Sequence, residues 1–281
     1  MLKDEAMTNA EAVIIGAIQG VSEWLPIGDA VHTNLVPSLL GWKFVSAPYT
    51  AFRAIIQIGA LLAAFLYLWK DIVRMISPGS INDPDELSSG GSGRILVPLI
   101  FGCIPAILVQ ALLRHHARIW DSHWIFPAIG TMILGLLFFH AEGGSKQGRK
   151  MSDVSVVDGF LVGIGQALGI GPGLSQSSTS LFLAMELGFE KSVAARFAFL
   201  LYLPAYTLFT LTDFFHYKSI IIASQLTHAA LLGSIAACVT GYLSLAILIR
   251  FLRSHPIYLF ALYRVFLGGF IIWLIGRHLL V

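Results

Sequence analysis

The strongest constraint on the fold is a series of six long apolar runs. They lie at about residues 53–69, 95–113, 124–140, 197–212, 229–250 and 257–276. A helix needs about 20 predominantly apolar residues to cross a bilayer. Only 12% of the 281 residues are charged, which is half of the share of about 25% that is typical of soluble domains. The sequence therefore predicts an all-α, multi-pass protein of the plasma membrane with about six full spans, in direct contact with membrane lipids.

Two further apolar regions are interrupted. The region at about residues 10–45 is broken at Pro26–Gly28, and the region at about 156–188 is broken by the glycine-rich segment 169–173. Irregular backbone at membrane depth leaves polar groups unpaired, and it is tolerated only where protein or a water-filled cavity surrounds it. Both regions are therefore predicted to be re-entrant or discontinuous helices.

The two interrupted regions also resemble each other. The fragment GAIQGVSEWLPIG begins at Gly16, and the fragment GIGQALGIGPGLSQS begins at Gly163. Interrupted segments at corresponding places in two halves indicate an inverted-topology repeat, with a site between the repeats. We predict a single membrane domain over residues 1–281, with repeat 1 at about 1–140 and repeat 2 at about 150–281.

Basic residues gather in three loops, around Arg74, Arg149 and Arg250. Under the positive-inside rule these loops face the cytoplasm. The first interrupted segment then enters the membrane from outside and the second from inside, as an inverted repeat requires. The formal net charge of +2 is too small to indicate a nucleic-acid partner.

The first interruption carries four polar side chains, namely Gln19, Glu23, Asp29 and His32. Gln19 and Glu23 share one helical face because they are four residues apart. An ionisable group inside a bilayer costs several kcal/mol unless it is paired or hydrated, so it tends to serve a function. These residues are candidates for catalysis, and the carboxylates of Glu23 and Asp29 are candidates for binding a metal. The alternative is an exposed outer loop, where such residues cost nothing.

The second interruption carries hydroxyls directly before the apolar run LFLAMEL, which we expect to be the helix. A helix N-terminus behind a glycine is a ready site for phosphate, since backbone N–H groups and the helix dipole favour an anion. Behind Gly173 this stretch holds Ser175, Gln176, Ser177, Ser178, Thr179 and Ser180, and the candidate phosphate ligands are Gly173, Ser175, Gln176, Ser177 and Ser180. A plain helix cap or a helix-packing surface is the alternative. Together the two interruptions indicate phosphate-ester or anhydride chemistry with a histidine or carboxylate as nucleophile or base. A divalent cation held by carboxylate and phosphate oxygens would also fit.

At these residues the sequence resembles the undecaprenyl-diphosphatase family, the bacitracin-resistance type of membrane phosphatase. That family carries the motifs E-G-x-T-E-[FW]-L-P-[VI]-S-S-[ST]-G-H and P-G-x-S-R-S-G-x-T, which read QGVSEWLPIGDAVH and PGLSQSSTS in this chain. The resemblance continues in FRAIIQIGALLAAFLYLW, RFAFLLYLPAY and FALYRV. It implies an inverted-repeat fold with two re-entrant segments, a polyprenyl-diphosphate substrate, and hydrolysis to the monophosphate with Mg²⁺ or Ca²⁺.

Several functional positions of the family carry over onto this chain. They are Glu23, His32, Pro172, Gly173, Ser175 and Ser177, with Ser180 in the place of a threonine.

Departures from the motifs fall at the centre of the proposed chemistry. Gln19 stands in place of the first glutamate, Gly28 and Asp29 in place of two serines, and Gln176 in place of the arginine that grips phosphate. Arginine is always charged and binds phosphate through two parallel bonds, whereas glutamine offers neutral donors. A metal on Glu23 and Asp29, or a displaced cation, would restore the charge balance. The candidate cations are Arg53, Arg196 and Arg264.

The sequence thus predicts a phosphatase that recycles a carrier lipid. His32 or Asp29 would attack the terminal phosphorus, Glu23 would bind metal or act as base, and Ser175 and Ser177 would hold the phosphate. A homodimer is among the expectations. The competing hypotheses are a polyprenyl-phosphate transporter or flippase and a non-catalytic homologue on the same scaffold, because inverted repeats with discontinuous helices are also a transporter architecture.

Overall fold

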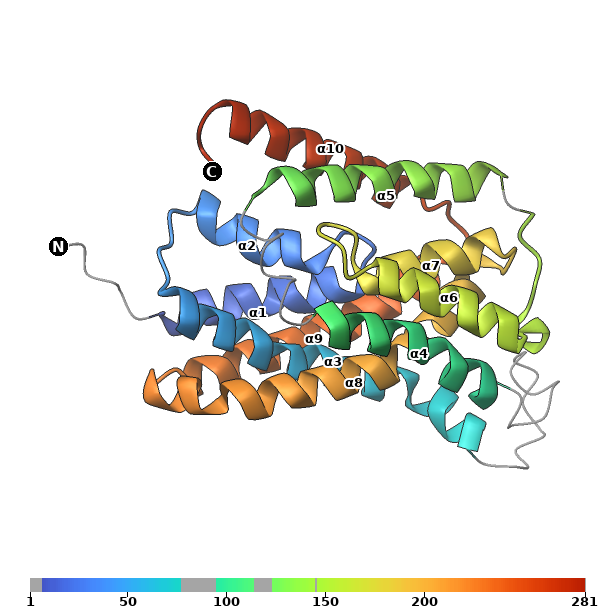
Figure 1. Cartoon of the computed structure of the whole chain (residues 1–281), viewed down its shortest axis with the longest axis horizontal. Coiled ribbons are helices and arrows are strands. Elements are labelled where there is room, and N and C mark those ends of the chain that lie inside the picture. The colour runs from blue at the N-terminus through green and yellow to red at the C-terminus, as the bar shows by residue number, and fades with distance from the viewer. Residues whose placement is uncertain (1–6, 77–94, 114–122, 145, 281) are drawn as a thin grey trace. The chain divides into compact units, whose positions relative to one another are not determined.

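A computed structural model describes residues 7–76, 95–113, 123–144 and 146–280. Helices make up its regular structure, and this part of the chain forms no strand (Figure 1). The helices are α1 (Asn9–Trp24), α2 (Asp29–Leu39), α3 (Ser46–Ile76), α4 (Leu96–Leu113), α5 (Ile125–Gly144), the short 3-10 helix η3 (Met151–Asp153), α6 (Val156–Leu168), α7 (Gln176–Glu186), α8 (Lys191–Ala223), α9 (Thr227–Leu252) and α10 (Tyr258–Gly276).

Six of the described helices are long and apolar enough to cross a membrane. They are α3, α4, α5, α8, α9 and α10, and each contains one of the six predicted apolar runs or most of it. The prediction of an all-α, multi-pass membrane protein is therefore confirmed.

Each interrupted region forms a pair of short helices. The helices α1 and α2 pack against each other, and so do α6 and α7 (Figure 1). The breaks fall at residues 25–28 and 169–175, as predicted. One detail was wrong, because α7 begins at Gln176 and not at the apolar run, so Ser177 and Ser180 lie inside its first turns. Re-entry of the two pairs into the membrane stays a prediction.

Both breaks end in the same unusual backbone conformation. Gly28 precedes α2 with φ +93° and ψ +109°, and Ser175 precedes α7 with φ +73° and ψ +123°. The two residues are equally far from Gly16 and Gly163, which begin the matching fragments. A positive φ is uncommon outside glycine and marks a constrained position when serine adopts it. This correspondence supports the proposed repeat.

The described chain divides into two compact units. The first unit comprises Met1–Tyr67 and Tyr206–Ile247, and the second comprises Leu68–Ala205 and Leu248–Val281. The helices α1 and α2 therefore belong to the first unit, and α6 and α7 to the second. The proposed repeat boundaries near residues 140 and 150 stay a prediction.

In each unit, the first helix of the pair packs on a neighbour through glycines. A Cβ at Gly16 would lie 2.1 Å from the carbonyl oxygen of Gly233 in α9. A Cβ at Gly163 would lie 1.8 Å from the carbonyl oxygen of Gly102 in α4. Small residues let helix backbones approach this closely, as is common in membrane proteins. The close packing fixes the height of each break along its neighbouring helix.

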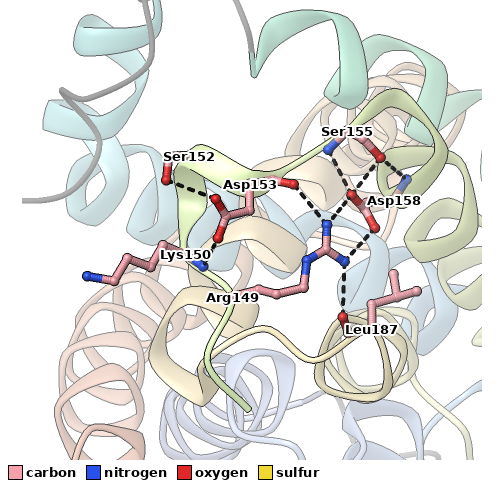
Figure 2. A network of polar contacts seen from close by, with 7 residues as sticks. All are labelled: Arg149, Lys150, Ser152, Asp153, Ser155, Asp158 and Leu187. Carbon is pink, nitrogen blue, oxygen red and sulfur yellow. Dashed lines mark hydrogen bonds and ion pairs between the residues drawn. The ribbon is translucent and has the colours of Figure 1, made fainter. Parts of the chain in front are cut away.

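A polar network fixes the start of α6 (Figure 2). The Arg149 guanidinium donates to both carboxylate oxygens of Asp158, at 2.9 and 2.7 Å, and to the Leu187 carbonyl at 3.0 Å. Ser155 caps the helix and donates to Asp158 at 2.6 Å. Burial raises the pKa of the Asp158 carboxyl, but the hydrogen bonds from Arg149 and Ser155 outweigh burial and hold that pKa below its usual value. Asp158 therefore stays ionised at neutral pH, and the network joins the first turn of α6 to the C-terminal end of α7.

Candidate active site

Gln19 and Glu23 form the core of a polar cluster in the first unit. Both side chains are buried at the end of α1, and Gln19 Nε2 donates to Glu23 Oε2 at 2.8 Å. The next residue, Trp24, donates from its indole to the Ala60 carbonyl at 3.2 Å and holds the helix end against α3. Gln19 and Glu23 thus lie on one face of α1, as predicted, and bond directly to each other.

Tyr206 of α8 completes this cluster. Its hydroxyl donates to the Gln57 carbonyl at 3.2 Å, and it also lies within hydrogen-bonding reach of Glu23 and close to the charge of Asp29. Glu23 and Asp29 therefore share one neighbour in the first unit. Sequence reasoning does not single out Tyr206, although it lies in the segment RFAFLLYLPAY that carries the resemblance.

His32 lies in the first turns of α2, half-buried, with a defined tautomer. Its Nδ1 bonds to the carbonyl oxygen of Gly28, which can only accept a hydrogen. In the neutral form of the ring, the proton therefore resides on Nδ1 and the lone pair on Nε2. The left-handed backbone at Gly28 brings this carbonyl back toward the histidine. The backbone of the break thus orients the imidazole of His32.

Two of the candidate cations are engaged elsewhere. Arg53 donates to the Asn34 side chain at 2.7 Å and ties α3 to α2. Arg196 forms an ion pair with Asp71 at 3.3 Å, so its charge is balanced within the second unit. These contacts do not assign either arginine to a phosphate.

Arg264 organises the second break. This fully buried guanidinium donates to the Gly173 carbonyl at 3.1 Å, the Leu174 carbonyl at 3.2 Å, and the Ser178 hydroxyl at 2.9 Å. A fourth bond reaches the Thr131 hydroxyl of α5 at 3.3 Å. One positive charge from α10 thus holds the loop that leads into α7.

A chain of hydroxyls continues from this arginine. Ser178 donates to the Ser175 hydroxyl at 3.2 Å, and the hydroxyls of Ser175 and Ser177 are also 3.2 Å apart. Two of the predicted phosphate ligands are therefore in contact with each other. Sequence reasoning does not rank Ser178 among them, yet it is the residue that connects the pair to Arg264.

Several buried polar atoms near this break have no partner among the described residues. They are the side-chain oxygen Oε1 of Gln176, the side-chain atoms Nε2 and Oε1 of Gln166, and the hydroxyl of Ser180. The side-chain Nε2 of Gln176 donates to the side-chain Oε1 of Gln110 in α4 at 3.3 Å. A buried polar atom without a hydrogen bond costs about 1–3 kcal/mol. The pair α6–α7 therefore buries several polar atoms whose hydrogen bonds are not made within the described residues.

The comparisons with known proteins decide the family. Residues 12–270 match the model of the family described as bacitracin resistance protein BacA. The chain belongs to this family.

Relatives with curated names agree in length and in name. The undecaprenyl-diphosphatase of Gloeobacter violaceus is 32% identical over 280 residues, which cover 96% of this chain and 93% of the relative. The undecaprenyl-diphosphatase of Pelodictyon phaeoclathratiforme is 33% identical over an alignment of 290 positions, gaps included, which covers 98% of this chain and 99% of the relative. That of Thermosynechococcus vestitus is 33% identical over 259 residues, which cover 92% and 93%.

Within the BacA family, this chain departs from the motifs at the first residue of each second helix. Asp29 begins α2 and Gln176 begins α7, each directly after the residue with positive φ. The helix dipole favours an acid at such a position. The first residue of the second helix is thus an acid at one break and a neutral amide at the other. The two clusters belong to different units, and their convergence on one cavity stays a prediction.

The donor set of the first cluster fits a divalent cation that arrives with a phosphate. The described residues contain no group of three or more His, Cys, Asp or Glu side chains that could hold a metal. The charges of Glu23 and Asp29 nevertheless both act on Tyr206. Mg²⁺ is commonly bound by one or two carboxylates together with substrate phosphate oxygens. These two carboxylates suit that mode of binding.

Proposed function

We propose that the protein hydrolyses a polyprenyl diphosphate of the undecaprenyl type to the monophosphate and so recycles a carrier lipid of envelope synthesis. The observation that carries the proposal is the loop before α7, where the buried Arg264 donates to the Gly173 and Leu174 carbonyls. This loop occurs in a chain that belongs to the BacA family. The relatives are named for this hydrolysis, and a membrane-embedded enzyme suits a substrate with a long isoprenoid tail.

The terminal phosphate would bind at the start of α7. Ser175 and Ser177 would donate from their hydroxyls, and the backbone N–H groups behind Gly173 would add donors aligned with the helix dipole. Arg264 would raise the positive potential of the loop through its bonds to the Gly173 and Leu174 carbonyls. Ser180 would contribute its buried hydroxyl from the next turn.

Attack on phosphorus would come from the first break. His32 Nε2 or the Asp29 carboxylate would form a bond to the terminal phosphorus while the bond to the bridging oxygen breaks, and the polyprenyl monophosphate would leave. Water would then release inorganic phosphate from the protein. Glu23, oriented by Gln19, would bind a cation or accept the proton of that water. When bound, Mg²⁺ or Ca²⁺ would offset the charge of the phosphate oxygens.

A phosphate-release assay tests the proposed function. The purified protein should liberate inorganic phosphate from a C55 or shorter polyprenyl diphosphate, with more activity in Mg²⁺ or Ca²⁺ than in EDTA. Unchanged activity and thermal stability in EDTA would exclude a metal on Glu23 and Asp29. A transporter would instead move the lipid between the leaflets of a vesicle and release no phosphate.

Replacement of Gln176 by arginine is expected to strengthen diphosphate binding or hydrolysis. A guanidinium at this position would add charged donors beside Ser175, and bonds of that kind are stronger than neutral ones. We expect a gain of about tenfold in kcat/KM, which corresponds to roughly 1.4 kcal/mol. If a folded Gln176→Arg protein is inactive, the site has been rebuilt around a different ligand, and the transporter hypothesis gains over the hydrolase.

A further inference from the structure

Gln110 is an isolated polar residue in a very apolar helix. The helix α4 is the most apolar of the six described helices that can span a membrane, and Gln110 is its one side chain with an amide or a charge. A polar group in such a helix is costly and usually faces a partner inside the protein. Its partner here is Gln176, since Gln176 Nε2 donates to Gln110 Oε1 at 3.3 Å.

The position of Gln110 is set by the packing of α4 on α6. Gly159 and Gly163 of α6 lie directly against the carbonyls of Pro98 and Gly102 in α4, where a Cβ would come within 2.2 and 1.8 Å of the carbonyl oxygens. Contact at two successive turns leaves little freedom for the helices to slide. The amide of Gln110 is thereby held beside the start of α7.

The two carboxamides can bond to each other in either sense. In the first orientation Gln176 Nε2 donates to Gln110 Oε1. The side-chain oxygen Oε1 of Gln176 is then buried and has no partner among the described residues. If both amide groups turn over, Gln110 donates and Gln176 offers its N–H group instead, because the amide oxygen and nitrogen occupy nearly equivalent positions. An anionic phosphate favours the second sense. An arginine would need no such helper, because all of its nitrogens donate.

We infer that Gln110 is a positioning residue of the phosphate site, which holds the Gln176 carboxamide so that it donates to the terminal phosphate in the place of a guanidinium. This inference rests on the proposed function for the nature of the ligand. It also explains how a chain with Gln176 retains a directed donor at the first residue of α7.

A double-mutant cycle tests the inference. Gln110→Met removes the amide and keeps the length of the side chain in an apolar helix, and it is made both in the natural chain and in Gln176→Arg. Binding of inorganic pyrophosphate is measured by calorimetry in detergent, together with KM and kcat for phosphate release. In the natural chain we expect Gln110→Met to weaken pyrophosphate binding and to raise KM about threefold to tenfold, the effect of one neutral hydrogen bond, with little change in kcat. In the Gln176→Arg background we expect a change of less than about twofold.

Gln110→Asn is the second variant, since it keeps the amide but is too short to reach Gln176 from the same backbone. It should behave like Gln110→Met, and thermal unfolding should place all variants close to the natural protein. Equal losses in both backgrounds would show a merely structural role and overturn the inference. So would an unchanged affinity in Gln110→Met, or a natural chain that does not bind pyrophosphate. Because binding needs no hydrolysis, a cycle that holds without phosphate release would overturn the proposed function and leave the inference standing.

Discussion

Replacement of Arg264 by methionine is expected to abolish phosphate release and to lower the thermal stability of the protein. The guanidinium is fully buried and donates to two loop carbonyls and two hydroxyls of the second unit. Methionine has a similar length but no donor, so these acceptors would lose a charged partner. Each buried acceptor that is left without a hydrogen bond costs about 1–3 kcal/mol. We expect phosphate release to fall at least about a hundredfold, which corresponds to roughly 2.7 kcal/mol.

The matched control is Arg277→Met at the exposed end of α10, where the guanidinium lies 5.9 Å from the centre of the Trp273 ring. That change should leave both activity and melting temperature nearly unaltered. Arg264→Lys keeps the charge but loses the fork of donors, so an intermediate loss is expected. A folded Arg264→Met protein with normal activity would show that the loop before α7 keeps its shape without the arginine.

The parts of the fold that sequence predicts well depend on local chemistry. The six spans follow from length and hydropathy alone, and all six apolar runs fall on long helices. The breaks follow from Pro26 and from the glycines of segment 169–173, which cannot continue a helix without cost. The bond between Gln19 and Glu23 follows from a spacing of four residues.

The parts that sequence predicts poorly depend on residues far apart in the chain. Arg264 is predicted as a displaced cation, but its role as the donor that holds residues 173 and 174 requires α10 to pack beside the loop. The sequence also predicts too late a start for α7, at the apolar run instead of Gln176. The reason is related, because Arg264 binds Ser178 inside the helix and stabilises the serine-rich first turn. The contributions of Tyr206 and Gln110 likewise come from tertiary contacts that no local pattern encodes.

Replacement of Glu23 by glutamine is expected to lower phosphate release about 10²- to 10⁴-fold, the usual contribution of a catalytic acid or base. Glutamine keeps the shape of the side chain, and its carbonyl oxygen can still accept the hydrogen bond from Gln19. The fold should therefore survive while the negative charge is lost. Glu190→Gln is the control, since Glu190 is a partly buried glutamate of the other unit and outside the proposed site. A Glu23→Gln protein that retains activity within about threefold would reduce Glu23 to a structural role.

The residual activity of Glu23→Gln distinguishes the two roles proposed for this carboxylate. If Glu23 binds the cation, a higher Mg²⁺ concentration should restore part of the activity, because the remaining carboxylate and the phosphate oxygens still form a weaker site. Asp29→Asn should then show the same dependence on Mg²⁺. If Glu23 is the base, the Mg²⁺ requirement should stay unchanged, and the acidic limb of the pH profile of kcat/KM should disappear with the carboxylate that produces it. The hydrogen bond from Gln19 orients the carboxylate of Glu23 and so agrees with either role, whereas the electrostatic influence of both Glu23 and Asp29 on one tyrosine favours the cation.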